Sequence, residues 1–321
     1  MKTFLHPLQN LAEMEAIYTK AKSNRGILEI SGCMESQKAH LIYGLSGLFT
    51  SHLILAEDEK AAKELYEDYR FYDKNVYYYP AKDLLFFQAD IHGNLLIRQR
   101  MRVIKALLEQ KENITVVTSI DGCMDYLQPL DKIEKQLIHF RNDSTLDMDK
   151  LKDALVHMGY ERVGQVEMPG QFSVRGGIVD IYSLTEENPW RIELWGDEID
   201  SIRTFDSQSQ RSLENLDEIM IYPATEQPAE KGGVSFLDYF AEKNSLVFLD
   251  EPNRLEENAR AVEEEFRQSC ENRQQKGEEN ISQNWMCRWE DLNHKLNNRN
   301  CISVSLMEPK RADWKITEQF N

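Results

Sequence analysis

A loop between an apolar strand and a helix is the feature that most constrains the fold of this 321-residue chain. Residues 26–30 (Gly-Ile-Leu-Glu-Ile) have the composition of a short buried strand, and residues 32–39 (Gly-Cys-Met-Glu-Ser-Gln-Lys-Ala) connect it to a helix. Gly32 and Lys38 match two positions of the phosphate-binding pattern G-x-x-x-x-G-K-[ST]. The order strand, loop, helix predicts the start of an α/β domain with a parallel sheet.

The same loop departs from the phosphate-binding pattern at the two positions that matter most. Gln37 replaces the second glycine, and its β-carbon obstructs the close approach of backbone amides to phosphate. Ala39 replaces the serine or threonine that ligates magnesium, and Glu35 adds negative charge. We therefore predict a vestigial loop with no catalytic residue, no bound metal and no cofactor. An ordinary strand-to-helix turn remains the alternative.

A second relic of such a site lies far along the chain. Residues 245–249 (Ser-Leu-Val-Phe-Leu) form a strand-like apolar run that ends in Asp250 and Glu251. A magnesium-coordinating acidic pair occupies this place in P-loop ATPases. Lys38 and Asp250 thus follow the chain order expected of one ancestral site. A strand end capped by a turn before Pro252 is equally compatible with the residues.

The strand and helix pattern divides the chain into three segments. Strands are predicted at 26–30, 53–56, 76–79 and 114–118, with helices between them, which indicates a parallel sheet. The middle segment has one helix at 147–158 and closely spaced strands at 162–168, 171–182, 190–195 and 199–205. The predicted fold class is α/β: a degenerate P-loop NTPase (helicase-like) domain in two parts, residues 1–131 and 224–321, with an inserted α+β domain at 132–223.

The charge of the chain restricts its partners. The net charge is -17 and the isoelectric point is about 4.9. Such a surface repels phosphates, so protein partners are favoured over DNA. The 5 cysteines form no Cys-x-x-Cys pair, which argues against a zinc site and suits the cytoplasm. No apolar run approaches the ~18 residues of a membrane span.

An aromatic run followed by basic residues leaves nucleic-acid binding open. The aromatic side chains include Tyr77, Phe86 and Phe87, and the basic ones are Arg98, Arg100, Arg102 and Lys105. Stacking aromatics beside arginines can hold single-stranded nucleic acid. The acidity of the chain favours the other interpretation, in which the aromatics are core and the basic residues a solvated helix face.

Strict alternation along residues 190–195 predicts a polar sheet face. Trp190, Ile192 and Leu194 point towards the core, so Arg191, Glu193 and Trp195 point outwards. Arg175 is outward on the strand predicted at 171–182, together with Gln171 and Ser173. Arginine and tryptophan are enriched at binding hot spots. The alternative is an internal salt bridge from Arg191 or Arg175 to Glu193, with Trp195 covering the sheet edge.

Two long segments resemble a nucleotide-excision-repair signature. They are residues 168–182 (MPGQFSVRGGIVDIY) and 190–206 (WRIELWGDEIDSIRTFD). The families with this pattern are the helicase UvrB and the transcription-repair coupling factor, Mfd. Residues 159–163 and 208–212 are more similar to Mfd, as is the degenerate loop at Lys38. The stretch from Pro80 to Leu95 is also too short for the DNA-probing hairpin of UvrB.

The resemblance implies the N-terminal UvrB-like module of Mfd, without the RNA-polymerase-binding and translocase domains. Such a module recruits UvrA in transcription-coupled nucleotide excision repair and is not itself an enzyme, although the whole factor is an ATP-dependent DNA translocase. The binding positions of the family fall on Arg175, Arg191, Glu193 and Trp195, where Mfd usually has phenylalanine in place of Trp195. RNA polymerase and DNA are reached through the missing domains. The alternative function is a UvrB-type DNA-dependent ATPase or DNA-binding module.

Overall fold

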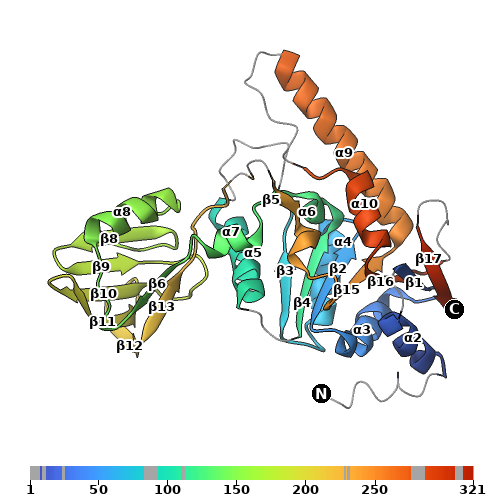
Figure 1. Cartoon of the computed structure of the whole chain (residues 1–321), viewed down its shortest axis with the longest axis horizontal. Helices are drawn as coiled ribbons and strands as arrows, with labels where there is room; N and C mark the ends of the chain where they lie inside the picture. The colour runs from blue at the N-terminus through green and yellow to red at the C-terminus, as the bar shows by residue number, and fades with distance from the viewer. Residues whose placement is uncertain are drawn as a thin grey trace. The chain divides into compact units, whose positions relative to one another are not determined.

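In the computed structural model the chain folds into two compact units (Figure 1). The first unit contains residues 1–88, 109–129 and 228–321, and the second contains 89–108 and 130–227. The residues described are 8, 12–23, 26–82, 93–109, 113–227, 229, 232–275, 286–307 and 314–320. Among them, no helix is both long and apolar enough to cross a membrane.

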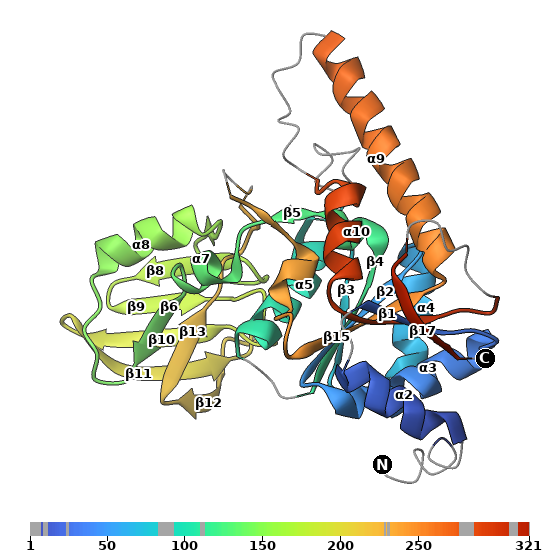
Figure 2. The ribbon, with the colours of Figure 1, turned by 45° about the vertical axis from the view of Figure 1, so that its right-hand side comes forward.

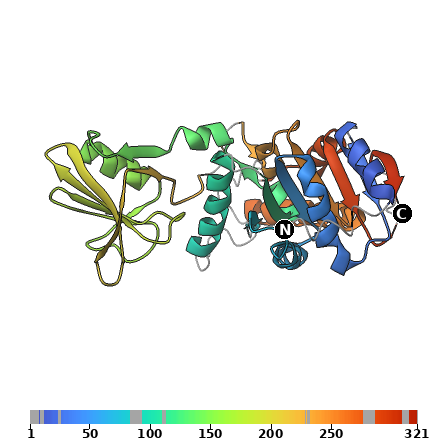
Figure 3. The same ribbon diagram turned by 90° about the horizontal axis from the view of Figure 1, so that it is seen from below.

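The first unit is built on one seven-stranded sheet in which every pairing is parallel. Its strand order is β17-β1-β16-β15-β2-β4-β3. The strands are β1 (Gly26–Ile30), β2 (Ser51–Ala56), β3 (Val76–Tyr79), β4 (Ile114–Ser119), β15 (Ser245–Asp250), β16 (Asn300–Val304) and β17 (Ile316–Phe320). Segments from both ends of the chain therefore share one sheet (Figure 3).

Helices flank this sheet. Buried residues of α2 (Ala12–Ser23), α3 (Glu35–Leu45) and α4 (Glu59–Tyr69) form one core with alternate side chains of the strands. The remaining helices are α6 (Ile120–Met124), α9 (Pro252–Gln275) and α10 (Trp289–Asn297), of which α10 contacts β1 and β16. The first unit also contains two short 3-10 helices, at Ser46–Leu48 and Phe236–Tyr239. It has one further strand pair, which joins β5 (Tyr126–Leu127) to β14 (Val234–Ser235).

The second unit contains a six-stranded sheet of order β12-β11-β10-β9-β8-β7 (Figure 2). Its strands are β7 (Glu161–Arg162), β8 (Gln171–Arg175), β9 (Ile178–Ile181), β10 (Trp190–Trp195), β11 (Glu198–Phe205) and β12 (Ser212–Leu216). All pairings are antiparallel except β7 with β8. A separate pair joins β6 (Ile138–Arg141) to β13 (Glu218–Ile221), and the helices are α5 (Gly93–Leu108), α7 (Leu130–Glu134) and α8 (Met148–His157).

The predicted fold class, a parallel α/β domain with an inserted α+β segment, is confirmed. Two strand predictions were wrong. Residues 171–182 form a hairpin, β8 and β9, rather than a single strand, and of residues 162–168 only Arg162 lies in a strand, β7. Gly176 supplies the positive φ of 60° that the turn needs, and a β-carbon at Gly177 would lie 3.1 Å from the carbonyl oxygen of Leu194. Arg175 consequently lies at a hairpin tip. The helix α5, predicted in the first α/β segment, groups with the second unit.

Candidate docking face and vestigial phosphate loop

The lysine of the vestigial loop is fully engaged by carboxylates. Lys38 lies in the first turns of α3, and its side chain is 1% exposed. Its Nζ lies 2.7 Å from Glu35 Oε1, 2.7 Å from Asp250 Oδ1 and 2.9 Å from Glu251 Oε1. The parallel sheet brings β15 to this edge, which places two residues more than two hundred positions apart in one ion pair. Three carboxylates surround one ammonium, so the cluster carries excess negative charge.

The protonation of this cluster follows from burial and charge. Burial, together with the charges of Glu35 and Glu251, raises the pKa of Asp250 to about 6 against the opposing effect of Lys38. Burial alone lowers the pKa of the Lys38 ammonium, but Asp250 and the hydrogen bonds to all three carboxylates raise it overall. Lys38 therefore stays charged and bound to its own chain.

The two substituted positions, Gln37 and Ala39, make structural contacts within the first unit. The Gln37 side-chain oxygen accepts the Met34 N–H at 3.3 Å, closing the loop on itself. Ala39 is buried in the core of the first unit and presents no oxygen to a metal ion. A phosphate at this edge would meet an occupied lysine, a side chain at Gln37 and excess negative charge.

A buried carboxylate organises the arginines of the second unit. Asp180 lies on β9 directly opposite Arg191 of β10, and its side chain is 1% exposed. Arg191 donates from Nε to Oδ1 at 2.6 Å and from Nη2 to Oδ2 at 2.8 Å. Arg175 donates from Nη2 to the same Oδ2 at 2.7 Å. One carboxylate is thus shared by two guanidinium groups, which leaves excess positive charge.

Arg191 has further partners on the sheet. Its Nη2 donates to Gln210 Oε1 at 3.0 Å, and its guanidinium carbon lies 4.3 Å from the ring centre of the buried Phe205. The hydrogen bonds to Asp180 raise the pKa of Arg191. The side chain is only 13% exposed. Arg191 is therefore a packed residue, contrary to the expectation that it points freely outwards.

Glu193 has an ion-pair partner within the chain, whereas Trp195 is exposed to solvent. Glu193 receives hydrogen bonds from Arg203, including one from Nη1 at 2.9 Å, and these lower its pKa. Trp195, at the tip of the β10–β11 hairpin, is 83% exposed. Trp195 and Arg175 lie on adjacent hairpins, since Leu194 N–H donates to the Gly177 carbonyl at 2.8 Å.

The four sequence-predicted docking residues lie on β8 and β10, which are separated by β9, and their partners differ from those expected. The alternative bridge from Arg191 or Arg175 to Glu193 was wrong, because both of these arginines bind Asp180 and Glu193 binds Arg203 instead. Ser173, predicted outward, is buried. Asp180 and Arg203 were missed, although each lies directly opposite Arg191 once the strands are aligned in register.

The basic helix α5 is tied down by its own unit. Arg98 donates to the Glu186 carbonyl at 3.1 Å, Lys105 pairs with the Glu186 carboxylate, and buried Arg100 binds Glu226. The predicted solvated face was therefore wrong for Arg100. Phe86, Phe87 and most of the stretch between Pro80 and Leu95 lie outside the described residues.

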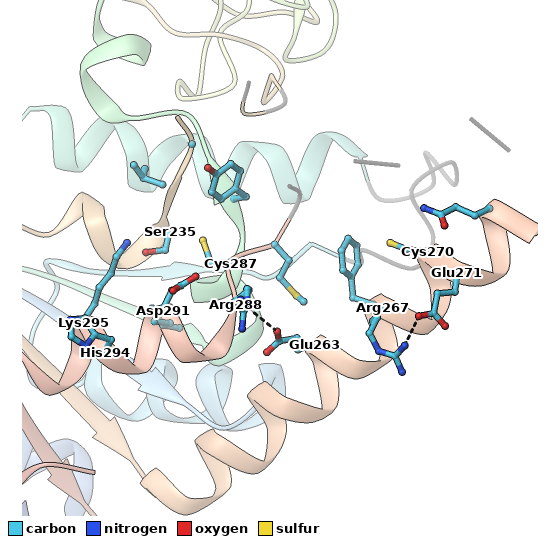
Figure 4. Close-up of a pocket in the computed structure, with 17 residues that line it drawn as sticks. Ser235, Glu263, Arg267, Cys270, Glu271, Cys287, Arg288, Asp291, His294 and Lys295 are labelled. Atoms are coloured by element: carbon cyan, nitrogen blue, oxygen red, sulfur yellow. Dashed lines mark hydrogen bonds and ion pairs between the residues drawn. The ribbon is translucent and has the colours of Figure 1, made fainter. Parts of the chain in front are cut away.

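A groove of about 760 Å³ in the first unit is lined by residues of α9 and α10 (Figure 4). Its cations already have carboxylate partners: Arg267 pairs with Glu264 and Glu271, and Lys295 pairs with Asp238. Cys287 lies in the lining, where burial raises its pKa to about 12. These features select no ligand class.

Comparison with known proteins gives one family match, within the second unit. Residues 138–226 match the UvrB interaction domain. The chain is also 38% identical over 222 residues to a transcription-repair-coupling factor of Bacillus subtilis, an alignment covering 63% of this chain. Relatives of the same name from Staphylococcus haemolyticus and Staphylococcus aureus are 37% and 36% identical over 47% and 48% of the chain.

The predicted resemblance to transcription-repair coupling factor is confirmed, and these matches associate the chain with DNA repair. The alignments span 19% of the Bacillus protein and 13% of each staphylococcal one. The chain therefore corresponds to a small part of these relatives. All four predicted docking residues lie within the UvrB interaction domain match.

Proposed function

We propose that this chain is a non-catalytic docking module that recruits UvrA in transcription-coupled nucleotide excision repair. The match of residues 138–226 to the UvrB interaction domain carries the proposal, together with the exposed Trp195 beside an arginine cluster. Tryptophan and arginine at one site supply apolar contact area and charge-assisted hydrogen bonds. In this proposal Arg175, Arg191, Glu193 and Trp195 form the docking face.

The proposal assigns separate roles to separate segments. In the proposal, residues 1–131 and 224–321 form a vestigial P-loop domain, apart from α5, which groups with the second unit, and residues 132–223 form the inserted UvrA-binding domain. The first is a scaffold because Lys38 is held by Asp250, Glu251 and Glu35. Contacts with RNA polymerase and DNA, and ATP-driven translocation, belong to parts of the factor beyond this chain. The place of action is the cytoplasm, where UvrA works.

A UvrB-type ATPase is the second candidate, and one observation favours it. Lys38 and Asp250 still meet at the sheet edge, as they would in an ancestral nucleotide site. Against it stand the side chain of Gln37, the missing hydroxyl at Ala39 and the charge of Glu35. An ATPase assay with and without DNA distinguishes the two functions, because only the second candidate turns over ATP.

The direct test of docking is calorimetric titration of the chain with purified UvrA, followed by competition with UvrB. If the matched domain is used, the chain binds UvrA saturably, and UvrB displaces it by competing for the same surface. Absence of binding at micromolar concentrations would overturn the proposal. Binding that UvrB leaves unchanged would place the contact elsewhere on the chain.

A further inference from the structure

The hydrogen-bond donors of the two arginines are used unequally. A guanidinium has two forks that can hold a carboxylate through a pair of N–H groups: Nε with Nη2, and Nη2 with Nη1. Arg191 gives its Nε and Nη2 fork to Asp180 and donates again from Nη2 to Gln210. Both forks of Arg191 are therefore engaged within the chain.

Arg175, in contrast, uses few of its side-chain donors within the chain. Its side chain donates one hydrogen bond, from Nη2 to Asp180, and no other to the residues that the structure describes. Because Nη2 carries two N–H groups, one in each fork, a single bond from Nη2 leaves Arg175 one complete fork. The side chain of Arg175 is 48% exposed, against 13% for Arg191. The position of Arg175 at the β8–β9 hairpin tip gives a partner open access to that fork.

We infer that Asp180 is a positioning residue which withdraws Arg191 from the partner and leaves Arg175 to bind a partner carboxylate in bidentate fashion. The inference rests on the proposed function and assigns different roles within its docking face. Asp180 aligns Arg175 through a single hydrogen bond, so the guanidinium is oriented before the partner arrives. Less rotamer entropy is then lost on binding.

The surface around Arg175 indicates the chemistry of the partner. Trp195 on the adjacent hairpin offers a large apolar side chain, while Glu193 is neutralised by Arg203. A complementary partner presents an aspartate or glutamate next to an apolar pocket. Two arginines sharing the Asp180 carboxylate make this part of an acidic chain locally positive, which favours such a partner.

Lysine substitutions separate the roles, because lysine keeps the charge but cannot form a fork. Calorimetric titration with UvrA should show Arg175→Lys weakening binding by roughly 10- to 100-fold, the usual range for one lost charged hydrogen bond. Arg191→Lys should weaken it by less than about 3-fold once thermal unfolding confirms that the variant is folded, since its ammonium still pairs with Asp180. Equal losses, or a larger loss for Arg191→Lys, would overturn the inference.

A double-mutant cycle tests the role of Asp180. Asp180→Asn should weaken UvrA binding in the parent chain but have little further effect in an Arg175→Ala background, because the residue acts through that arginine. A purely structural role would produce the same loss in both backgrounds and would contradict the inference. Trp195→Ala serves as the reference: if it also binds like the parent, the proposed docking face itself is wrong.

Discussion

The vestigial phosphate loop and the docking face solve opposite charge problems. At the loop, one buried ammonium is shared by Glu35, Asp250 and Glu251. On the β8–β10 face, one buried carboxylate is shared by two guanidinium groups. The first arrangement leaves negative charge at the position where a phosphate would bind. The second leaves positive charge and one open guanidinium fork beside an exposed tryptophan.

The two clusters therefore differ in the sign of the charge that they leave unbalanced. A lysine as buried as Lys38 would be costly without partners, and the three carboxylates offset that cost. The arginine pair is only half-neutralised, so it retains capacity for a partner. In the proposed assignment, charge balance rather than the presence of a basic residue separates the phosphate-loop relic from the docking face.

The largest expected effect comes from removing the buried cation. Lys38→Met leaves Asp250 and Glu251 facing each other without a counter-ion, and should cost about 3–5 kcal/mol of unfolding free energy. Urea denaturation measures this loss. The control Lys60→Met removes a lysine that is 82% exposed and should change stability by less than ~0.5 kcal/mol. Equal effects of the two substitutions would show that the cluster at Lys38 is not structural.

The corresponding change on the docking face is smaller. Arg191→Ala leaves Asp180 with Arg175 alone, and we expect a loss of about 2–3 kcal/mol in unfolding free energy. Chemical denaturation measures the unfolding free energy of Arg191→Ala. The control is Arg141→Ala, because the Arg141 side chain is 67% exposed. A stable Arg191→Ala would mean that Asp180 does not depend on it.

The pH dependence of the cluster at Lys38 tests its excess charge. The pKa of Asp250 is about 6 in the folded chain, above the ordinary 3.8, so the folded state binds the proton more tightly. The parent therefore loses stability as pH rises from about 4 to 6, and Asp250→Asn avoids this loss. Relative to the parent, the variant should gain on the order of 2 kcal/mol between pH 4 and pH 7. A relative loss over this range would show that Lys38 dominates and holds the carboxyl ionised.

The smallest expected effect is on nucleotide binding. The parent chain should hydrolyse no ATP and bind it no better than millimolar. Gln37→Gly with Ala39→Thr restores the missing pattern but leaves Lys38 in its ion pairs, so any gain in ATP affinity should stay below about 10-fold, or ~1.4 kcal/mol. Fluorescent-nucleotide titration measures it. Measurable turnover by the parent would refute the account of the loop.

The sequence predicted the fold class because the patterns involved are local. The apolar strands at residues 26–30 and 245–249 and the substitutions at Gln37 and Ala39 can be recognised without any tertiary contact. The carboxylates around Lys38 could be anticipated only in part. Asp250 was expected near Lys38, whereas the contact from Glu35 depends on a rotamer that sequence does not specify.

The docking face was predicted less completely, for a geometric reason. Alternation assigns side chains to a face but says nothing about register, so the opposition of Asp180 to Arg191 remained hidden. Treating residues 171–182 as one strand also ignored the turn at Gly176, which places Arg175 at a tip. Exposure of Trp195 was predicted correctly because it follows from the alternation alone.

The most direct test of the central claim is titration of UvrA with Trp195→Ala beside the matched variant Phe71→Ala. Both aromatics are exposed, at 83% and 77%, and Phe71 belongs to the unit that contains the vestigial loop. The account predicts that Trp195→Ala weakens UvrA binding by roughly 30- to 1,000-fold, as for other hot-spot residues. Phe71→Ala should bind like the parent, and both variants should retain the parent circular dichroism spectrum. Parent-like binding by Trp195→Ala, or an equal loss in Phe71→Ala, would contradict the account.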